Sequence, residues 1–378
     1  PMFTSIPPVS RSLLFLFVLL SSALITACNS SDTTSASSDL DTGAVALLIT
    51  DAPTSAYDEM NVVAEQVSLI GEGHEAHLMK RQSKFNLLDL RNTFRRLSKS
   101  RARVGTYSKV RCRIKEVNLV KYIYDGDGNV IGKEITTPRM RKNFVDLSVA
   151  QFAVSRHHKL VVKLDLDADK SLVTDPTDPT APPEFDPDAT VDVDEVPTDT
   201  DAPPQEVTPV LMNELGDVRN LQADSFDLCN TGTDGSVECV QVNVSPDTVV
   251  MNDLLEGVTG ISDLNETFQW QVFGHLDVTT DQINALQVIE HNSSHRSYSG
   301  ALSGNVGDVV SDQIDLDVAG TIYPVKSVSL AGIYDSAGNV LDASVLVAGV
   351  NVEVIGTLLG FGPSATLTPG VIIISDQQ

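Results

Sequence analysis

The chain has 378 residues, enough for two or three domains that each bury a core. Its formal charge of −25 argues against nucleic acid as the main partner, because phosphate backbones are bound by positive surfaces. Only one segment, at the N-terminus, is apolar enough to meet a membrane, which excludes a polytopic membrane protein.

Residues 1–28 have the pattern of a secretory signal that ends in a lipobox, Leu24-Ile25-Thr26-Ala27-Cys28. We expect lipid on the Cys28 thiol, since two or three acyl chains hold a protein stably to a bilayer. The alternative is a plain signal peptide that ends near a cysteine. The polar residues 29–43 predict a flexible tether. Asn29 and Ser30 resemble residues compatible with outer-membrane sorting in Gram-negative bacteria, so we expect an extracytoplasmic, lipid-anchored protein there.

Charge divides the rest of the chain into three segments. Residues 44–173 hold 22 Lys and Arg against 15 Asp and Glu, whereas residues 207–378 hold 3 against 22. Between them, residues 174–206 hold 11 acidic residues, no Lys or Arg and many prolines. The sequence therefore predicts a basic domain, a disordered acidic linker and an acidic region.

Residues 44–173 show strand patterns throughout. Apolar runs at 45–50, 60–63, 67–70 and 160–166 and the alternating residues 107–124 predict β-strands. Residues 125–129 predict a hairpin turn rather than a calcium loop, because the sixth and twelfth loop positions are Val130 and Thr136.

Several ordered motifs in this segment resemble a bacterial lipoprotein domain, domain of unknown function 4382. They are Leu48-Ile49-Thr50-Asp51-Ala52-Pro53, Tyr57-Asp58, Asn61-Val62, Leu87-Leu88-Asp89-Leu90, Gly105-Thr106-Tyr107 with Arg111, Leu164-Asp165-Leu166-Asp167 and Ser171-Leu172-Val173. The resemblance implies an extracytoplasmic β-sandwich-type domain and no known activity.

The stretch from Arg91 to Lys115 contains ten basic residues and no acidic one. Leu87, Leu90, Phe94 and Leu97 recur at helical spacing and predict a short amphipathic helix over part of it. One interpretation is a site for anionic glycan or lipid headgroups formed by Arg95, Arg96, Arg101 and Arg103. The other, which we favour, is that these charges face the acidic segments of the same chain.

Residues 207–378 contain a repeat, since Phe268–Leu276 aligns with Val350–Leu358 as an alternating strand that runs into a glycine. Each copy has a strand before it and a short strand after it. We therefore predict two small β-barrel-like repeats, residues 207–292 and 293–378, with the glycines at sharply bent corners. The repeats resemble domain of unknown function 5666, which implies a barrel like that of oligonucleotide- and oligosaccharide-binding proteins.

The cysteines and histidines give few chemical signals. Cys229 and Cys239 flank a turn-rich segment and predict a disulfide in an exported protein, while Cys112 is expected to be a buried free thiol. We find no nucleophile elbow, phosphate loop or dinucleotide motif, and no histidine or cysteine cluster that predicts a metal or cofactor.

These observations favour an all-β, non-enzymatic lipoprotein of the cell envelope that acts as a binding or assembly module. Two alternatives stay open. One is an adhesin that binds polyanionic glycan or lipid headgroups through the basic stretch 91–115. The other is a carbohydrate-active envelope enzyme, which a cleft containing carboxylates of raised pKa would favour.

Overall fold

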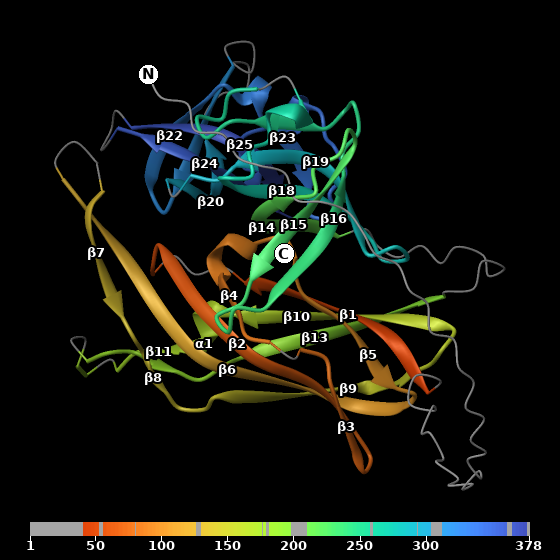
Figure 1. Ribbon diagram of the computed structural model, residues 1–378. Coiled ribbons are helices and arrows are strands. Elements are labelled where there is room, and N and C mark those ends of the chain that lie inside the picture. Colours follow the sequence, from red (N-terminus) through yellow and green to blue (C-terminus); the bar gives the residue numbers. More distant parts are fainter. Residues whose placement is uncertain are drawn as a thin grey trace, which may run out of the picture. The chain divides into compact units, whose positions relative to one another are not determined.

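The computed structural model describes residues 41–378, except for 53–55, 80, 126–129, 176, 179–180, 198–209, 258–259, 293, 304–311, 361–364 and 376–378. The predicted signal segment, Cys28 and most of the predicted tether lie outside the described residues. The regular secondary structure of the described residues is nearly all β-strand, as the sequence predicts, and these residues form an N-terminal domain and two barrels (Figure 1).

The N-terminal domain, residues 42–197, is a sandwich of two main sheets. One sheet has the order β13-β10-β1-β5, and the other has the order β3-β2-β6-β7, with β4 on β2 and β9 on β6. Its elements are β1 (Thr42–Ala52), β2 (Glu59–Gly71), β3 (His74–His77), β4 (Ser83–Asn86), η1 (Leu87–Leu90), β5 (Arg95–Arg103), β6 (Gly105–Tyr124), β7 (Val130–Thr136), β8 (Arg139–Met140), β9 (Phe144–Val154), β10 (His158–Asp167), α1 (Ala168–Ser171), β11 (Leu172–Val173), β12 (Glu184–Phe185) and β13 (Ala189–Pro197).

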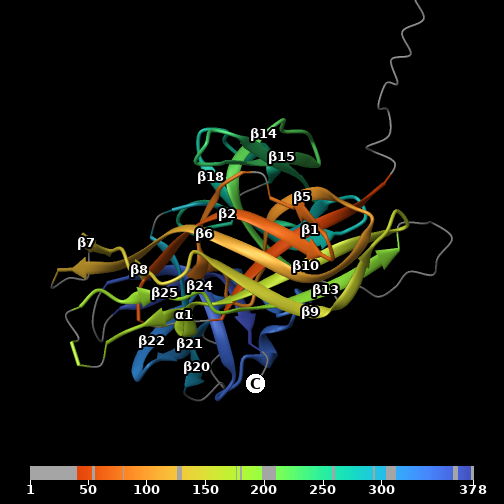
Figure 2. The same ribbon diagram turned by 90° about the horizontal axis from the view of Figure 1, so that it is seen from below.

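The sheet that contains β1 lies between the other sheet and the barrels, which explains the continuous apolar run in β1. Leu47 and Ile49 belong to the core between the two sheets, whereas Leu48 belongs to a cluster shared with the first barrel. Figure 2 shows the opposite layer, with the long strands β2, β6 and β9 across the face that is seen from below.

Two local predictions for this domain are wrong. The segment expected to form an amphipathic helix is a short 3-10 turn, η1, followed by strand β5, which pairs antiparallel with β1. Cross-strand pairing with β1 overrides the helical spacing of the leucines. The tether also ends earlier than predicted, because β1 begins at Thr42, which pairs with Arg103.

The acidic segment 174–206 is not wholly a disordered linker. Residues 189–197 form β13, which pairs antiparallel with β10 from Ala189 opposite Leu166 to Pro197 opposite His158. The valines of β13 pack against the sandwich core, and the neighbouring aspartates meet cations of the first domain: Lys163 contacts Asp194 at 2.6 Å and Asp192 at 3.6 Å. The prediction of disorder rested on the many prolines and the few large apolar residues, and it failed because pairing with β10 stabilises a strand that the segment could not form alone.

Each barrel closes on five strands. In the first barrel β14 pairs β15 and β18, β15 pairs β16, β18 pairs β19, and a parallel pairing of β16 with β19 closes the ring. Its elements are β14 (Leu211–Arg219), β15 (Ser225–Thr231), β16 (Val237–Asn243), β17 (Val249–Met251), η2 (Ile261–Asp263), β18 (Gln269–Asp277) and β19 (Gln282–Glu290).

The second barrel repeats this topology strand for strand, with a parallel β22–β25 closure. Its elements are β20 (His295–Ser303), β21 (Gln313–Val318), β22 (Thr321–Lys326), η4 (Val328–Leu330), β23 (Gly332–Asp335), η5 (Ala343–Val345), β24 (Asn351–Leu359) and β25 (Thr366–Ile374). The ring order is that of a small five-stranded Greek-key barrel.

The glycines that end the alternating strands mark the barrel corners. The β18–β19 register shifts between Phe273 and Gly274, and the β24–β25 register shifts at the equivalent step, between Ile355 and Gly356. A Cβ on Gly274 would overlap the carbonyl oxygen of Asn284, so the neighbouring strand can approach only because a glycine is present.

Candidate functional site: a polar cavity where the domain and both barrels meet

The N-terminal domain is joined to the first barrel through an apolar centre. Leu48, Val161 and Val196 lie on the side of their sheet that faces away from the sandwich core. They belong to one buried cluster with barrel residues that include Met212 and Trp270. Burial of such side chains contributes about 1.5–3 kcal/mol each, so this contact is part of the folded core.

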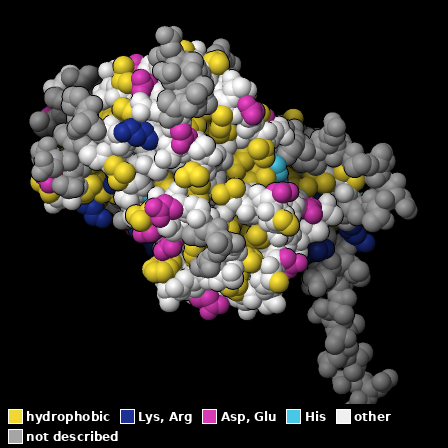
Figure 3. Space-filling view, turned by 90° about the horizontal axis from the view of Figure 1, so that it is seen from above, with side chains coloured by type: hydrophobic (Ala, Val, Ile, Leu, Met, Phe, Trp, Pro, Cys, Tyr) yellow, Lys and Arg dark blue, Asp and Glu magenta, His cyan; other side chains and the backbone are white. Residues whose placement is uncertain are grey.

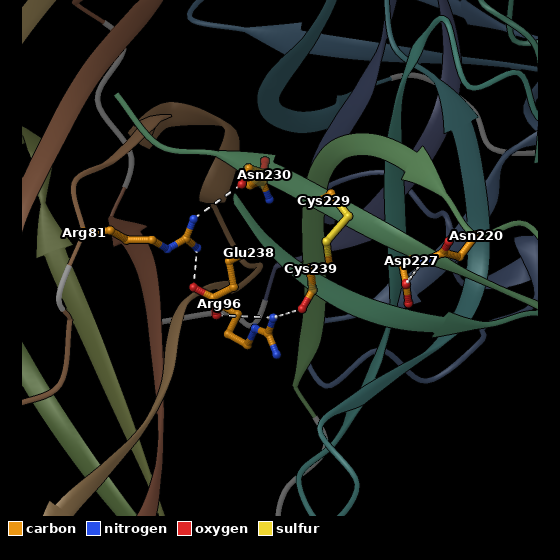
Figure 4. The surroundings of a disulfide bond; sticks show 8 residues. All are labelled: Arg81, Arg96, Asn220, Asp227, Cys229, Asn230, Glu238 and Cys239. Atoms are coloured by element: carbon orange, nitrogen blue, oxygen red, sulfur yellow. Dashed lines mark hydrogen bonds and ion pairs between the residues drawn. A yellow bond between two sulfur atoms is a disulfide. The ribbon is translucent and has the colours of Figure 1, made fainter. Parts of the chain in front are cut away.

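Ion pairs surround this apolar centre. Arg81 and Arg96 both reach Glu238, which neighbours Cys239, and Arg96 also donates to the Cys239 carbonyl oxygen at 3.0 Å (Figure 4). Lys159, buried at 4% side-chain exposure, pairs with Asp281, which Lys99 also contacts at 2.7 Å. The basic segment therefore meets the acidic barrel of the same chain, as the favoured interpretation of the sequence expects.

The four arginines proposed for anion binding do not form one surface. The guanidinium of Arg95 lies 3.8 Å from Glu214 and donates to Asn230 of the first barrel at 3.2 Å. Arg96 is covered by the same barrel, with 6% of its side chain exposed. Arg101 and Arg103 are exposed at the far end of β5, where Arg101 donates to Thr42. Arg95 and Arg96 are thus covered by the barrel and cannot contact an anion at the outer surface of the protein.

The two barrels are joined by a second apolar cluster. Phe273 and Ile289 of the first barrel pack with Tyr334 and Ile373 of the second. At its centre the fully buried Gln287 donates to the carbonyl oxygen of Gly370 at 2.8 Å. The face of the barrels that Figure 3 shows carries scattered acidic side chains and few basic ones, in keeping with the charge of this region.

One loop of the N-terminal domain, residues 87–94, contacts both barrels. Asn213 of the first barrel donates to the carbonyl oxygen of Asp89 at 2.8 Å. In the second barrel, Glu353 accepts a hydrogen bond from Asn92 at 3.1 Å, and Arg91 donates to Ser299 at the same distance. The loop therefore fixes the position of the domain against both barrels through polar contacts.

In each repeat the loop contacts one member of an equivalent pair of hydrogen-bonded side chains, Asn213 in the first and Glu353 in the second. Strand registers place Gln271 of β18 at the position that Glu353 occupies in β24, and Asn213 of β14 at the position of Ser297 in β20. Gln271 donates to Asn213 at 2.8 Å, and Ser297 donates to Glu353 at 2.5 Å. One repeat thus uses a neutral amide pair where the other uses an acid and a hydroxyl.

A cavity of about 450 Å³ lies where the domain and the barrels meet. This volume is within the range of about 300–1,000 Å³ that is typical of small-molecule sites. The polar side chains that the N-terminal domain contributes to the lining of the cavity are Asp58, Glu59, Asn61, Lys84, Asn86, Asp89 and Arg95.

The barrels supply the remaining walls. The polar side chains from the first barrel include Asn213, Asp217, Asn230, Gln269 and Gln271. Those from the linker between the barrels and from the second barrel are His291, His295, Arg296 and Ser297. Arg296 stacks over the Tyr122 ring, with its guanidinium carbon 3.6 Å from the ring centroid, which fixes a cation at the edge of the cavity.

Burial shifts the pKa values of several groups around this cavity. It raises the pKa of Asp89 to about 7, and the nearby Glu59 carboxylate adds to the shift. It raises the pKa of Asp58 and lowers the pKa values of His291 and His295. Beside the cavity, burial raises the pKa of Glu353 to about 7, although the hydrogen bond from Ser297 acts to lower this pKa. Clusters of shifted groups in a cavity are typical of functional sites.

The structure confirms both cysteine predictions. Cys229 and Cys239 form a disulfide between β15 and β16, and Cys112 is a buried free thiol whose pKa burial raises to about 12. Within the described ranges, no group of three or more metal-ligating side chains is placed to hold a metal ion.

The sequence did not reveal the cavity, because its residues come from eleven separate elements or loops of three parts of the chain. Asp58, Asn61 and Asp89 belong to the motifs that carry the family resemblance, so a signal for one wall was present. The amides of β14 and β18 gave no signal, because alternating polar residues are equally typical of a solvent-facing strand.

No helix among the residues described is long and apolar enough to cross a membrane. No curated protein and no solved structure matches the chain. A protein-family model does match its first part: residues 42–180 are similar to a family described as a domain of unknown function, DUF4382. This match confirms the resemblance expected for the N-terminal domain, whose activity the family leaves open.

Proposed function

We propose that this protein is a non-enzymatic lipoprotein of the cell envelope that binds a small polar ligand in the cavity between its domain and barrels. The observation that carries the proposal is the cavity itself, whose hydrogen-bonding walls come from all three parts. A lipid on Cys28 would hold the protein to the outer membrane of a Gram-negative bacterium, and residues following Cys28 would act as a tether.

The anchor is tested by mass spectrometry of the mature N-terminus. We expect an acylated Cys28 as the first residue, and we expect Cys28→Ser to move the protein from the membrane fraction to the aqueous fraction. A mature chain that begins elsewhere without lipid would contradict the proposed anchor.

Binding is tested by native mass spectrometry of the full chain with fractionated small molecules of the cell envelope. Ser297→Phe places a ring in the cavity and should abolish the added mass, while Thr321→Phe, exposed on β22 and outside the cavity, should retain it. Equal binding by both variants would place the ligand elsewhere.

A carbohydrate-active enzyme remains a second candidate because of one observation. The cavity contains Asp58, Glu59 and Asp89, and the raised pKa of Asp89, about 7, suits a general acid. Hydrolysis of chromogenic glycosides that is lost in Asp89→Asn and Glu59→Gln would favour this candidate over a binding module. We also propose that the two barrels are related to domain of unknown function 5666. That relation would assign no ligand, because a shared fold does not determine function.

A further inference from the structure

We infer that the ligand of this cavity is an uncharged, hydroxyl-rich molecule, a short saccharide. The inference rests on the proposed function and gives the chemical class of the ligand. It follows from the balance of charge in the cavity, from the amides in its walls and from the hydrogen-bonding groups that the protein leaves unused.

Neither sign of charge dominates the cavity. The walls contain four acidic side chains, Asp58, Glu59, Asp89 and Asp217, and three cations, of Lys84, Arg95 and Arg296. Arg95 is already 3.8 Å from the buried Glu214, and Arg296 stacks on Tyr122. An anionic ligand would meet the carboxylates and a cationic ligand the guanidinium groups, so an uncharged ligand avoids both repulsions.

Amide side chains are the most frequent polar groups of the walls, and they are Asn61, Asn86, Asn213, Asn230, Gln269 and Gln271. Hydrogen bonds hold them in place: Asn61 donates to Glu59 at 2.8 Å, Asn86 to Asp89 at 2.9 Å and Gln269 to Asp217 at 3.3 Å. Side chains that are ordered before binding lose little entropy when a ligand arrives.

These amides keep unused hydrogen-bonding capacity. Each amide can donate two hydrogen bonds and accept two. Within the described part of the chain, no hydrogen bond uses Oε1 of Gln271, Oε1 of Gln269 or Oδ1 of Asn61. Interleaved donors and acceptors match hydroxyl groups, because each hydroxyl both donates and accepts.

The cavity also has an apolar part that a sugar can use. Phe85, Leu90, Leu215 and Ile355 contribute to its lining. The C–H faces of a sugar ring pack on such side chains while its hydroxyls point to the amides, which is the usual division of a small-molecule site.

The test uses the full chain in detergent, with histidines labelled with ¹⁵N, and titrates it with chitobiose, cellobiose and maltose as probes. His291 and His295 line the cavity, so their imidazole resonances report binding at this site. We expect at least one disaccharide to shift both signals and to leave that of the exposed His157 unchanged.

Variants separate recognition from folding. Gln269→Leu, on the exposed end of β18, and Gln271→Met should each weaken disaccharide binding by about tenfold or more, since each removes a hydrogen bond. Gln241→Met, exposed on β16 of the same barrel and outside the cavity, should leave the affinity unchanged.

Inorganic phosphate serves as the charged probe. If phosphate shifts the two histidines and no disaccharide does, the cavity binds ligands and the inference of a saccharide is wrong. If no probe shifts them at millimolar concentration, the inference is wrong and the proposed binding function also loses its support. Equal affinity of the wild-type and Gln269→Leu proteins would contradict recognition through the wall amides.

Discussion

At the scale of single residues, the most consequential feature is a buried acid where the other repeat has an amide. Glu353 has no exposed surface, and its pKa is raised to about 7 because burial disfavours the charged form. Asp51 and Asp89 are raised in the same direction, to about 8 and about 7, both mainly by burial. All three buried acids are therefore better tolerated as neutral carboxyls than as carboxylates, and one of them, Glu353, joins the second barrel to Asn92 of the N-terminal domain.

Because the pKa of Glu353 is raised, the stability of the fold depends on pH. A carboxyl whose folded pKa lies above its unfolded value stabilises the fold fully below the unfolded pKa and loses that contribution as pH rises through the folded pKa. For Glu353 the window runs from 4.5 to about 7. Glu353→Gln, which copies Gln271 of the first repeat, should raise the free energy of unfolding by about 1–3 kcal/mol above neutral pH.

The higher free energy of unfolding of Glu353→Gln should disappear at acidic pH, because Glu353 of the wild type is then neutral as well. Thermal unfolding followed by circular dichroism across this pH range measures the difference. The reverse exchange, Gln271→Glu, should destabilise the protein at neutral pH. A Glu353→Gln protein that follows the wild type at every pH would show that burial of this acid costs nothing.

The free thiol gives a second residue-scale prediction. Because Cys112 is 5% exposed and its pKa is raised to about 12, we expect no reaction with a maleimide in the native state near pH 8, and full reaction in urea. Mass spectrometry counts the adducts. Rapid labelling of the native protein would mean that β6 opens far more readily than its core position indicates.

At the scale of elements, the sequence predicted most strands because their signals are local. The alternation in 107–124 became β6, and the turn-rich segment between Cys229 and Cys239 connects the antiparallel strands β15 and β16. The errors have one cause. The expected helix and the expected disordered linker each contain a strand, β5 and β13, whose stability comes from neighbours distant in sequence.

The corner glycines provide a matched pair of element-scale tests. A Cβ on Gly274 would overlap the backbone of Asn284, and one on Gly356 would overlap the backbone of Thr368. We expect Gly274→Ala and Gly356→Ala each to destabilise their barrel by about 2 kcal/mol or more. Gly257→Ala, with open space around its Cβ, is the control, and urea unfolding is the measurement. Alanines tolerated at both corners would argue against the bent-strand interpretation.

At the scale of the whole molecule, the charge division seen in the sequence becomes a set of contacts. The basic strand β5 and its neighbours face the acidic first barrel, with Asp281 between Lys99 and Lys159 and with Glu238 between Arg81 and Arg96. The charge composition of the segments predicted this attraction between the basic N-terminal domain and the acidic barrel. It could not predict the cavity, since a cavity depends on how three separately patterned surfaces meet.

Removal of one charge should weaken this assembly. Asp281→Asn leaves Lys159, which is 4% exposed at its side chain, without a carboxylate partner, and losing one member of a buried pair costs about 3–5 kcal/mol. We expect a larger radius of gyration in small-angle scattering and a lower unfolding temperature. Lys170→Met, at an exposed pair with Asp167, should change neither, and an Asp281→Asn protein of unchanged size and stability would contradict the importance of the pair.

The place of β13 limits where this chain can be divided. The segment similar to DUF4382 ends at residue 180, before β13 begins at Ala189, yet β13 covers the outer side of β10 along nearly its whole length. A protein truncated at the family boundary would expose the hydrogen-bonding edge of β10, and bare edges of this kind recruit other chains into aggregates. Recombinant production of the first domain alone should therefore extend through Pro197.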